Sequence, residues 1–134
     1  MSKRETPLTL RYWEETGGTL VEEARIVEAG TENRWRDVDA LLLLDGPRER
    51  HPRRCWCPDL TGRQVVVVQT KAAPLGMSLL GQAFFSRALV LKRFRPAAVR
   101  AVVLCTRGDA VLTAVARDHG IEVVVYPSER TGFG

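Results

Sequence analysis

The chain has 134 residues, of which 45% are hydrophobic and 27% charged, and its 20 Lys and Arg against 16 Asp and Glu give a formal net charge of +4. This composition predicts one domain, residues 1–134, with a core large enough to need neither disulfides nor a structural metal. An odd count of 3 cysteines, no signal peptide and no apolar run near the roughly twenty residues of a membrane span exclude secreted disulfide scaffolds and membrane proteins. We therefore expect a cytoplasmic protein with no membrane partner.

Basic charge is concentrated in the middle of the chain. Residues 46–100 contain eleven Lys or Arg against two acids, whereas residues 1–45 contain ten acids against six bases. A basic middle beside an acidic start suits a polyanion held near metal-binding carboxylates, and arginine binds phosphate oxygens bidentately. The alternative is a solvated basic surface without a ligand.

The first elements in chain order are a helix and two strands. Pro7 suits a first helical position, and two glycines end the predicted helix near Thr16. Loose alternation over 19–29 predicts a strand with one exposed face, and the apolar run within 36–44 predicts a buried strand.

A long basic loop, residues 46–62, follows these strands. Loops of this length are usually functional or mobile. Basic residues interleaved with Trp56 indicate either a flap that touches nucleic acid or a mobile surface. The residues predicted to bind nucleic acid are those of this loop and two from the following helix: Arg48, Arg50, Arg53, Arg54, Arg87 and Lys92.

The second half of the chain predicts alternating strands and helices. The expected elements are a strand at 65–71, a helix at 77–93, a strand at 101–105, a helix from 108–109 to 119–120, a strand at 121–126 and a mobile tail at 127–134. Antiparallel strands followed by a right-handed crossover give a mixed sheet with helices on both faces. The prediction is an α/β fold, a single-domain α/β/α sandwich with a mixed five-stranded sheet.

Polar residues stand at the ends of the two most apolar strands. If 41–44 and 65–68 pair as an antiparallel hairpin, Asp39 lies next to Gln69 and Lys71. Asp37 shares the face of Asp39 and is an outer alternative. Asp59 also follows a proline, but a turn and about 30 Å of extended chain separate it from Gln69, so we do not expect it in the site.

This trio has the chemistry of a phosphodiester-cleaving site. Mg²⁺ prefers oxygen ligands and keeps several waters, so one carboxylate, one amide oxygen and a substrate phosphate can hold it. An ammonium can orient or deprotonate the attacking water and stabilise charge on the phosphodiester.

The pattern of an Asp, a long gap and Gln-x-Lys, here Asp39, Gln69 and Lys71, resembles the PD-(D/E)xK nuclease superfamily and its Gln-x-Lys branch, typified by Mrr-type endonucleases. The resemblance implies a restriction-endonuclease-like fold and a Mg²⁺- or Mn²⁺-dependent nuclease. It implies that Asp39 and Gln69 bind the metal, while Lys71 assists the water. The implied substrate is DNA, with RNA as the alternative.

Three further residues and an oligomeric state follow from the resemblance. Many members add a Glu from their first helix, so Glu14 or Glu15 is a candidate, and Gln82 is a candidate to support the site from the long helix. Members commonly form homodimers, and the aromatic residues left for an interface are Trp35, Trp56, Phe85 and Tyr126. Because Gln69 replaces the commoner acid, the alternative function is an inactive nuclease-like module that binds nucleic acid or a protein partner.

Overall fold

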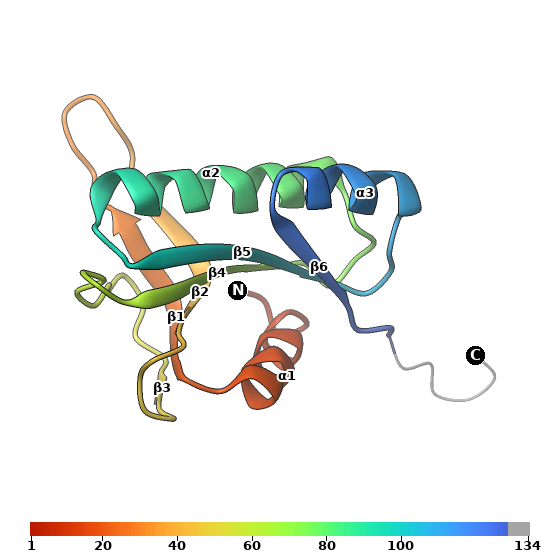
Figure 1. Ribbon diagram of the computed structural model, residues 1–134, viewed down its shortest axis with the longest axis horizontal. Helices are drawn as coiled ribbons and strands as arrows, with labels where there is room; N and C mark the ends of the chain where they lie inside the picture. The colour runs from red at the N-terminus through yellow and green to blue at the C-terminus, as the bar shows by residue number, and fades with distance from the viewer. Residues whose placement is uncertain (129–134) are drawn as a thin grey trace.

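The computed structural model describes residues 1–128, and so residues 129–134 of the expected mobile tail lie outside the described part. Three helices and six strands follow one another along the chain (Figure 1). Their bounds are α1 Thr6–Thr16, β1 Thr19–Val27, β2 Arg36–Leu43, β3 Arg50–His51, β4 Gln64–Thr70, α2 Met77–Arg93, β5 Ala98–Cys105, α3 Ala110–Asp118 and β6 Ile121–Val125. No helix within residues 1–128 combines the length and the apolar character that crossing a bilayer requires.

All six strands belong to one mixed sheet in the order β3-β1-β2-β4-β5-β6. The neighbours β1, β2 and β4 are antiparallel, whereas β4, β5 and β6 are parallel, as a crossover through α2 and α3 requires. Helices α2 and α3 cover one face of the sheet and α1 covers the other (Figure 1). The predicted α/β class with a mixed sheet is confirmed.

The expected count of five strands is wrong by one, because the 46–62 loop contains β3. This two-residue strand pairs in parallel with β1, and the backbone N–H of Leu20 donates to the carbonyl of Glu49 at 2.9 Å. The same loop returns to β1 at Trp56, whose carbonyl accepts from the N–H of Arg25 at 3.2 Å. The loop is therefore held along the edge of the sheet at both of these points.

The central strands are apolar on both faces because both faces are covered. On the side of α2, Leu41, Val65 and Val67 pack with Val90 in one buried cluster. On the side of α1, Leu42, Val66 and Val68 pack with Tyr12 in another. This burial explains why β2 and β4 appear in the sequence as continuous apolar runs without alternation.

Gly18 makes the tight connection between α1 and β1, and we expect its replacement by alanine to cost about 3 kcal/mol of folding stability. Its φ is +81°, and an added Cβ would overlap the backbone carbonyl of Leu43. Gly17→Ala is the matched control, because Gly17 has φ +82° but open space around it. Urea denaturation of both variants checks this, and equal losses would show that φ, rather than the contact, sets the cost.

Candidate active site at the ends of strands β2 and β4

The regular ladder between β2 and β4 stops at the pair Ala40 and Val68, although both strands continue. Beyond it, side chains take over the hydrogen bonding. The N–H of Asp39 donates to Gln69 Oε1 at 3.3 Å, and the N–H of Thr70 donates to Asp39 Oδ2 at 2.8 Å. Asp39 and Gln69 therefore lie side by side, as the hairpin argument predicts.

The Gln69 side chain connects β2 with α2. Its Oε1 accepts from the N–H of Asp39, and its Nε2 donates to Ser86 Oγ at 3.0 Å. The residue is only 5% exposed. Both polar atoms of this buried amide are hydrogen-bonded, and leaving either unpaired would cost about 1–3 kcal/mol of stability. The Gln69 side chain is therefore held firmly in place between β2 and α2.

The Asp39 carboxyl lies among other charged groups near the start of α1. Burial raises the pKa of Asp39 above its ordinary value, and the nearby carboxylates of Glu5 and Glu23 raise it further. The N–H of Thr70 and the amino group of Met1, which contacts Glu23, act in the opposite direction. The site therefore holds its carboxylate at a cost in free energy, which a bound cation would relieve.

Glu23 reaches this position because β1 is irregular there. Its φ is +48°, an uncommon value for a residue other than glycine, and the ladder with β2 skips it between Glu22 and Ala24. On β2, Val38 packs in the same cluster as Leu41, so strict alternation fails between them. Strict alternation, from which we expected Asp37 to share the face of Asp39, therefore does not hold along β2.

Lys71 directly follows β4. Its backbone N–H donates to the carbonyl of Leu104 at 2.9 Å, which continues the pairing with β5, while the residue is exposed. None of the ion pairs found within residues 1–128 involves Lys71. The Lys71 backbone therefore lies at the end of β4 next to Thr70, and its side chain has no carboxylate partner among the described residues.

Glu14 and Glu15 lie at the far end of α1. Glu15 pairs with Arg11 at 3.4 Å and affects the pKa of Tyr126, which places it away from Asp39. The helix begins at the site, where Thr9 Oγ1 lies 2.8 Å from Thr70 Oγ1. Nine or ten residues of helix, about 14 Å, separate these acids from Glu5. The acid that adjoins Asp39 is instead Glu5, the residue just before this helix, which sequence reasoning missed.

Gln82 and Asp37 line a cavity of about 530 Å³ on the α2 side of the sheet, together with Gln69. Gln82 therefore lies in the same cavity as Gln69, and its supporting role stays a prediction. Asp37 instead forms an ion pair with Arg25, with 2.9 Å between Oδ1 and Nε. Asp59 accepts from the N–H of Thr61 at 3.0 Å in a turn, as expected for a residue outside the site.

Half of the basic side chains predicted to contact nucleic acid are engaged within the fold. Arg50 binds both carboxylate oxygens of Glu22 at 3.0 and 3.2 Å, and Arg54 pairs with Glu23 at 2.8 Å. Arg87 donates to two backbone carbonyls at the end of α3, at 2.7 Å each. The remaining three are Arg48 over the ring of Trp13, Arg53 over the ring of Trp56, and the exposed Lys92.

Two of the four aromatic residues considered for an interface belong to the fold instead. Tyr126 is 7% exposed, and Trp56 packs against the buried cluster on the α2 side. Trp35 and Phe85 remain 52% and 66% exposed.

Within residues 1–128, no group of three or more His, Cys, Asp or Glu side chains is arranged to hold a metal ion. A comparison of the chain with protein-family profiles, curated proteins and solved structures finds no match. The arrangement of Asp39, Gln69 and Lys71 is therefore the feature of this chain that bears most directly on function.

Proposed function

We propose that the chain is a metal-dependent nuclease with a restriction-endonuclease-like fold that acts on DNA. The observation that carries this proposal is the junction at the ends of β2 and β4, where Asp39 and Gln69 are hydrogen-bonded and Lys71 follows directly. A largely buried carboxylate with a raised pKa is typical of functional sites. The proposal includes a homodimer, for which the exposed Trp35 and Phe85 offer apolar contact area.

The residues at the junction fit a loosely held Mg²⁺ or Mn²⁺. Asp39 Oδ2 accepts from Thr70, whereas Oδ1 receives no hydrogen bond from the described residues, and Gln69 Oε1 retains a second lone pair. Mg²⁺ typically takes one or two carboxylates and fills its other positions with waters and substrate phosphate. When bound, the ion would neutralise phosphate charge and lower the pKa of a bound water.

The protein's own groups complete the chemistry. Asp39 would bind the cation. A clamp, formed by the hydrogen bonds of the Gln69 side chain to the Asp39 N–H and to Ser86, fixes the position of the Asp39 backbone. The Lys71 ammonium can orient the attacking water and stabilise the negative charge that develops on the phosphodiester. If these groups act in this way, the wild-type chain should nick supercoiled plasmid DNA in Mg²⁺ or Mn²⁺ and leave it intact in EDTA.

The alternative function is a nuclease-like module that binds nucleic acid or a protein partner without cutting. One observation favours it: both polar atoms of Gln69 already have protein partners. An amide used in this way brings no negative charge to a cation. DNA binding without any nicking in either metal would support this alternative and contradict the nuclease.

Gln69→Glu should tighten Mg²⁺ binding by about tenfold while lowering the stability of the metal-free protein, since it adds a buried charge beside Asp39. The new carboxylate can accept from both the Asp39 N–H and the Ser86 hydroxyl, so the clamp survives. Calorimetric titration measures the affinity. Gln82→Glu is the matched control, because Gln82 lines the same cavity without bonding to Asp39. Equal gains in both variants would refute a direct role for Gln69.

DNA binding should weaken steeply with salt, with a log-log slope of roughly −0.9 for each neutralised phosphate of duplex DNA. Arg53→Ala should reduce this slope by about one, because Arg53 is an exposed cation that stacks on Trp56. Arg50→Ala is the control, since Glu22 already neutralises Arg50. Fluorescence anisotropy at several salt concentrations measures both slopes, and a wild-type slope near zero rules out the basic surface as a DNA contact.

A further inference from the structure

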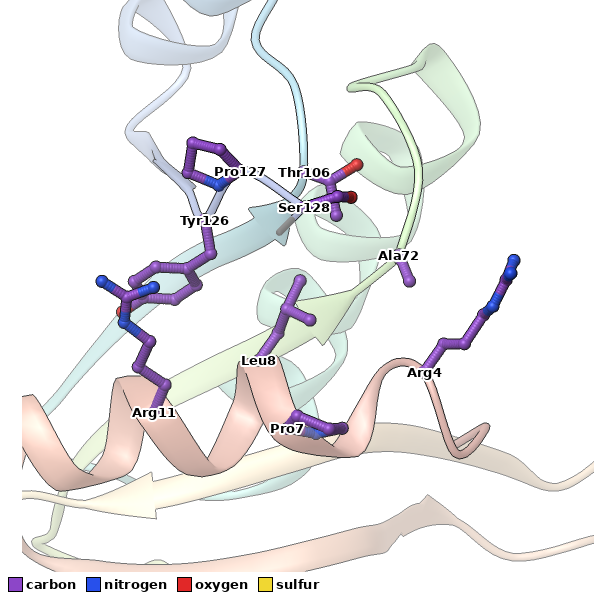
Figure 2. A pocket seen from close by; sticks show the side chains of 9 residues that line it. All are labelled: Arg4, Pro7, Leu8, Arg11, Ala72, Thr106, Tyr126, Pro127 and Ser128. Carbon is purple, nitrogen blue, oxygen red and sulfur yellow. The ribbon is translucent and has the colours of Figure 1, made fainter. Parts of the chain in front are cut away.

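A second cavity, of about 480 Å³, lies on the α1 side of the sheet, where three parallel strands end. Ala72, Thr106 and Tyr126 follow β4, β5 and β6 and form one wall, and the start of α1 forms the other (Figure 2). Open α/β sheets bind ligands in crevices outside the carboxyl ends of their parallel strands. The position and volume are those of a ligand site.

The charge of this cavity is positive. Arg4 and Arg11 stand at its two ends with Leu8 between them (Figure 2), and no acidic residue is among the described residues that line it. The Arg11 guanidinium lies 4.3 Å from the centre of the Tyr126 ring and is also paired with Glu15. Each guanidinium group can bind phosphate oxygens bidentately, so each end of the cavity offers a position for a phosphate.

The floor of the cavity is apolar and partly aromatic. Leu8, Pro7 and Tyr126 supply it, and the hydroxyl of Thr106 adds a polar atom at the rim (Figure 2). A flat ring can lie on such a surface while its edge reaches polar groups. A nucleotide combines an anionic phosphate with a flat heterocycle, and so it matches this lining.

We propose that this cavity binds one nucleotide of the nucleic-acid substrate, with its base against Leu8 and its flanking phosphates at Arg4 and Arg11. The location connects it with the candidate active site, because Ala72 directly follows Lys71. The inference that this nucleotide adjoins the scissile phosphodiester rests on the proposed function. A base inside the cavity cannot stay paired, so the substrate class is DNA with an unpaired nucleotide, such as a strand end or a single-stranded segment.

The test titrates deoxyadenosine monophosphate into the full chain in EDTA by calorimetry, beside deoxyadenosine and inorganic phosphate. We expect the mononucleotide to bind at least about tenfold more tightly than either part alone. The double variant Arg4→Ala, Arg11→Ala should weaken it by about tenfold or more. The double variant Arg95→Ala, Arg117→Ala removes the same charge from exposed positions elsewhere and should have no effect.

A substitution that fills the cavity distinguishes recognition of the base from recognition of the phosphate charge. Ala72→Leu places apolar volume in the cavity and leaves both arginines in place, so it should lose the mononucleotide but keep phosphate binding. Equal affinity for phosphate and mononucleotide, no mononucleotide binding, or full binding by the Arg4 and Arg11 double variant would each overturn the proposal.

The proposed nuclease function can fail independently of the proposed nucleotide site. If the chain binds the mononucleotide but cuts no DNA, the nucleotide site stands and the nuclease does not. If it cuts DNA but binds no mononucleotide, only the inference about this cavity fails.

Discussion

Asp39→Asn should abolish metal binding and DNA cleavage and at the same time stabilise the metal-free protein at neutral pH by about 1 kcal/mol, or roughly 4 °C in melting temperature. The carboxylate is costly because it is partly buried near Glu5 and Glu23. Asparagine removes the charge, and its side-chain oxygen can still accept from the N–H of Thr70. Thermal unfolding in EDTA measures the gain.

The pH dependence of this gain follows from the raised pKa of Asp39. The stabilising effect of the neutral carboxyl is fully present below the ordinary Asp pKa and is lost as pH rises through the raised value. Wild type and Asp39→Asn should therefore be equally stable in acid and differ at neutral pH. Metal binding should fall as pH is lowered through the same pKa, because only the ionised form of Asp39 holds a cation. A variant that is less stable than wild type at neutral pH would show that the Asp39 carboxylate has a structural role.

Lys71→Ala should slow DNA cleavage at least about 100-fold while leaving stability and metal affinity unchanged. The reason is its placement: the side chain is exposed and its backbone N–H, which alanine keeps, supplies the pairing with Leu104. Its contribution is made mainly in the transition state. Cleavage rates at saturating DNA measure the loss.

Arg117→Ala is the control for the lost positive charge, because Arg117 is exposed on α3, across the sheet from α1. It should cut DNA at the wild-type rate. A Lys71→Ala protein that cuts at the wild-type rate removes Lys71 from the mechanism, and one with a lower melting temperature points to a structural ion pair.

The central strands could be predicted from sequence because their burial leaves a direct signal. Four leucines and four valines in separate runs indicate strands covered on both faces, and the antiparallel register that follows from them places Asp39 beside Gln69. The long helix α2 has the predicted bounds Met77–Arg93, since Gly76 and Pro96 bracket an apolar periodicity.

The strand β3 could not be predicted in this way. It has two residues, too few for a period, and it forms because Arg50 reaches Glu22 while the backbone pairs with β1. The basic character of the loop likewise does not reveal that acids of β1 neutralise Arg50 and Arg54, because this pairing depends on tertiary contacts.

The acid from α1 was misplaced for a similar reason. Glu14 and Glu15 lie near the apolar stripe of the helix, but only the packing of Thr9 against Thr70 shows which end of α1 meets the site. A weak local signal did exist in Glu5, which accepts from the N–H of Ser2 just before Pro7. Likewise, the positive φ of Glu23 breaks the alternation of β1, which no pattern of side chains predicts.

The most direct test of the central claim is a calorimetric titration of Mn²⁺ and Mg²⁺ into wild type, Asp39→Asn and Asp37→Asn. Asp37 is the matched control because it lies two residues away on the same strand but is paired with Arg25. We expect one cation site in wild type, the same site in Asp37→Asn and none in Asp39→Asn. Cation binding that survives in Asp39→Asn, or that is absent from wild type, would contradict this claim.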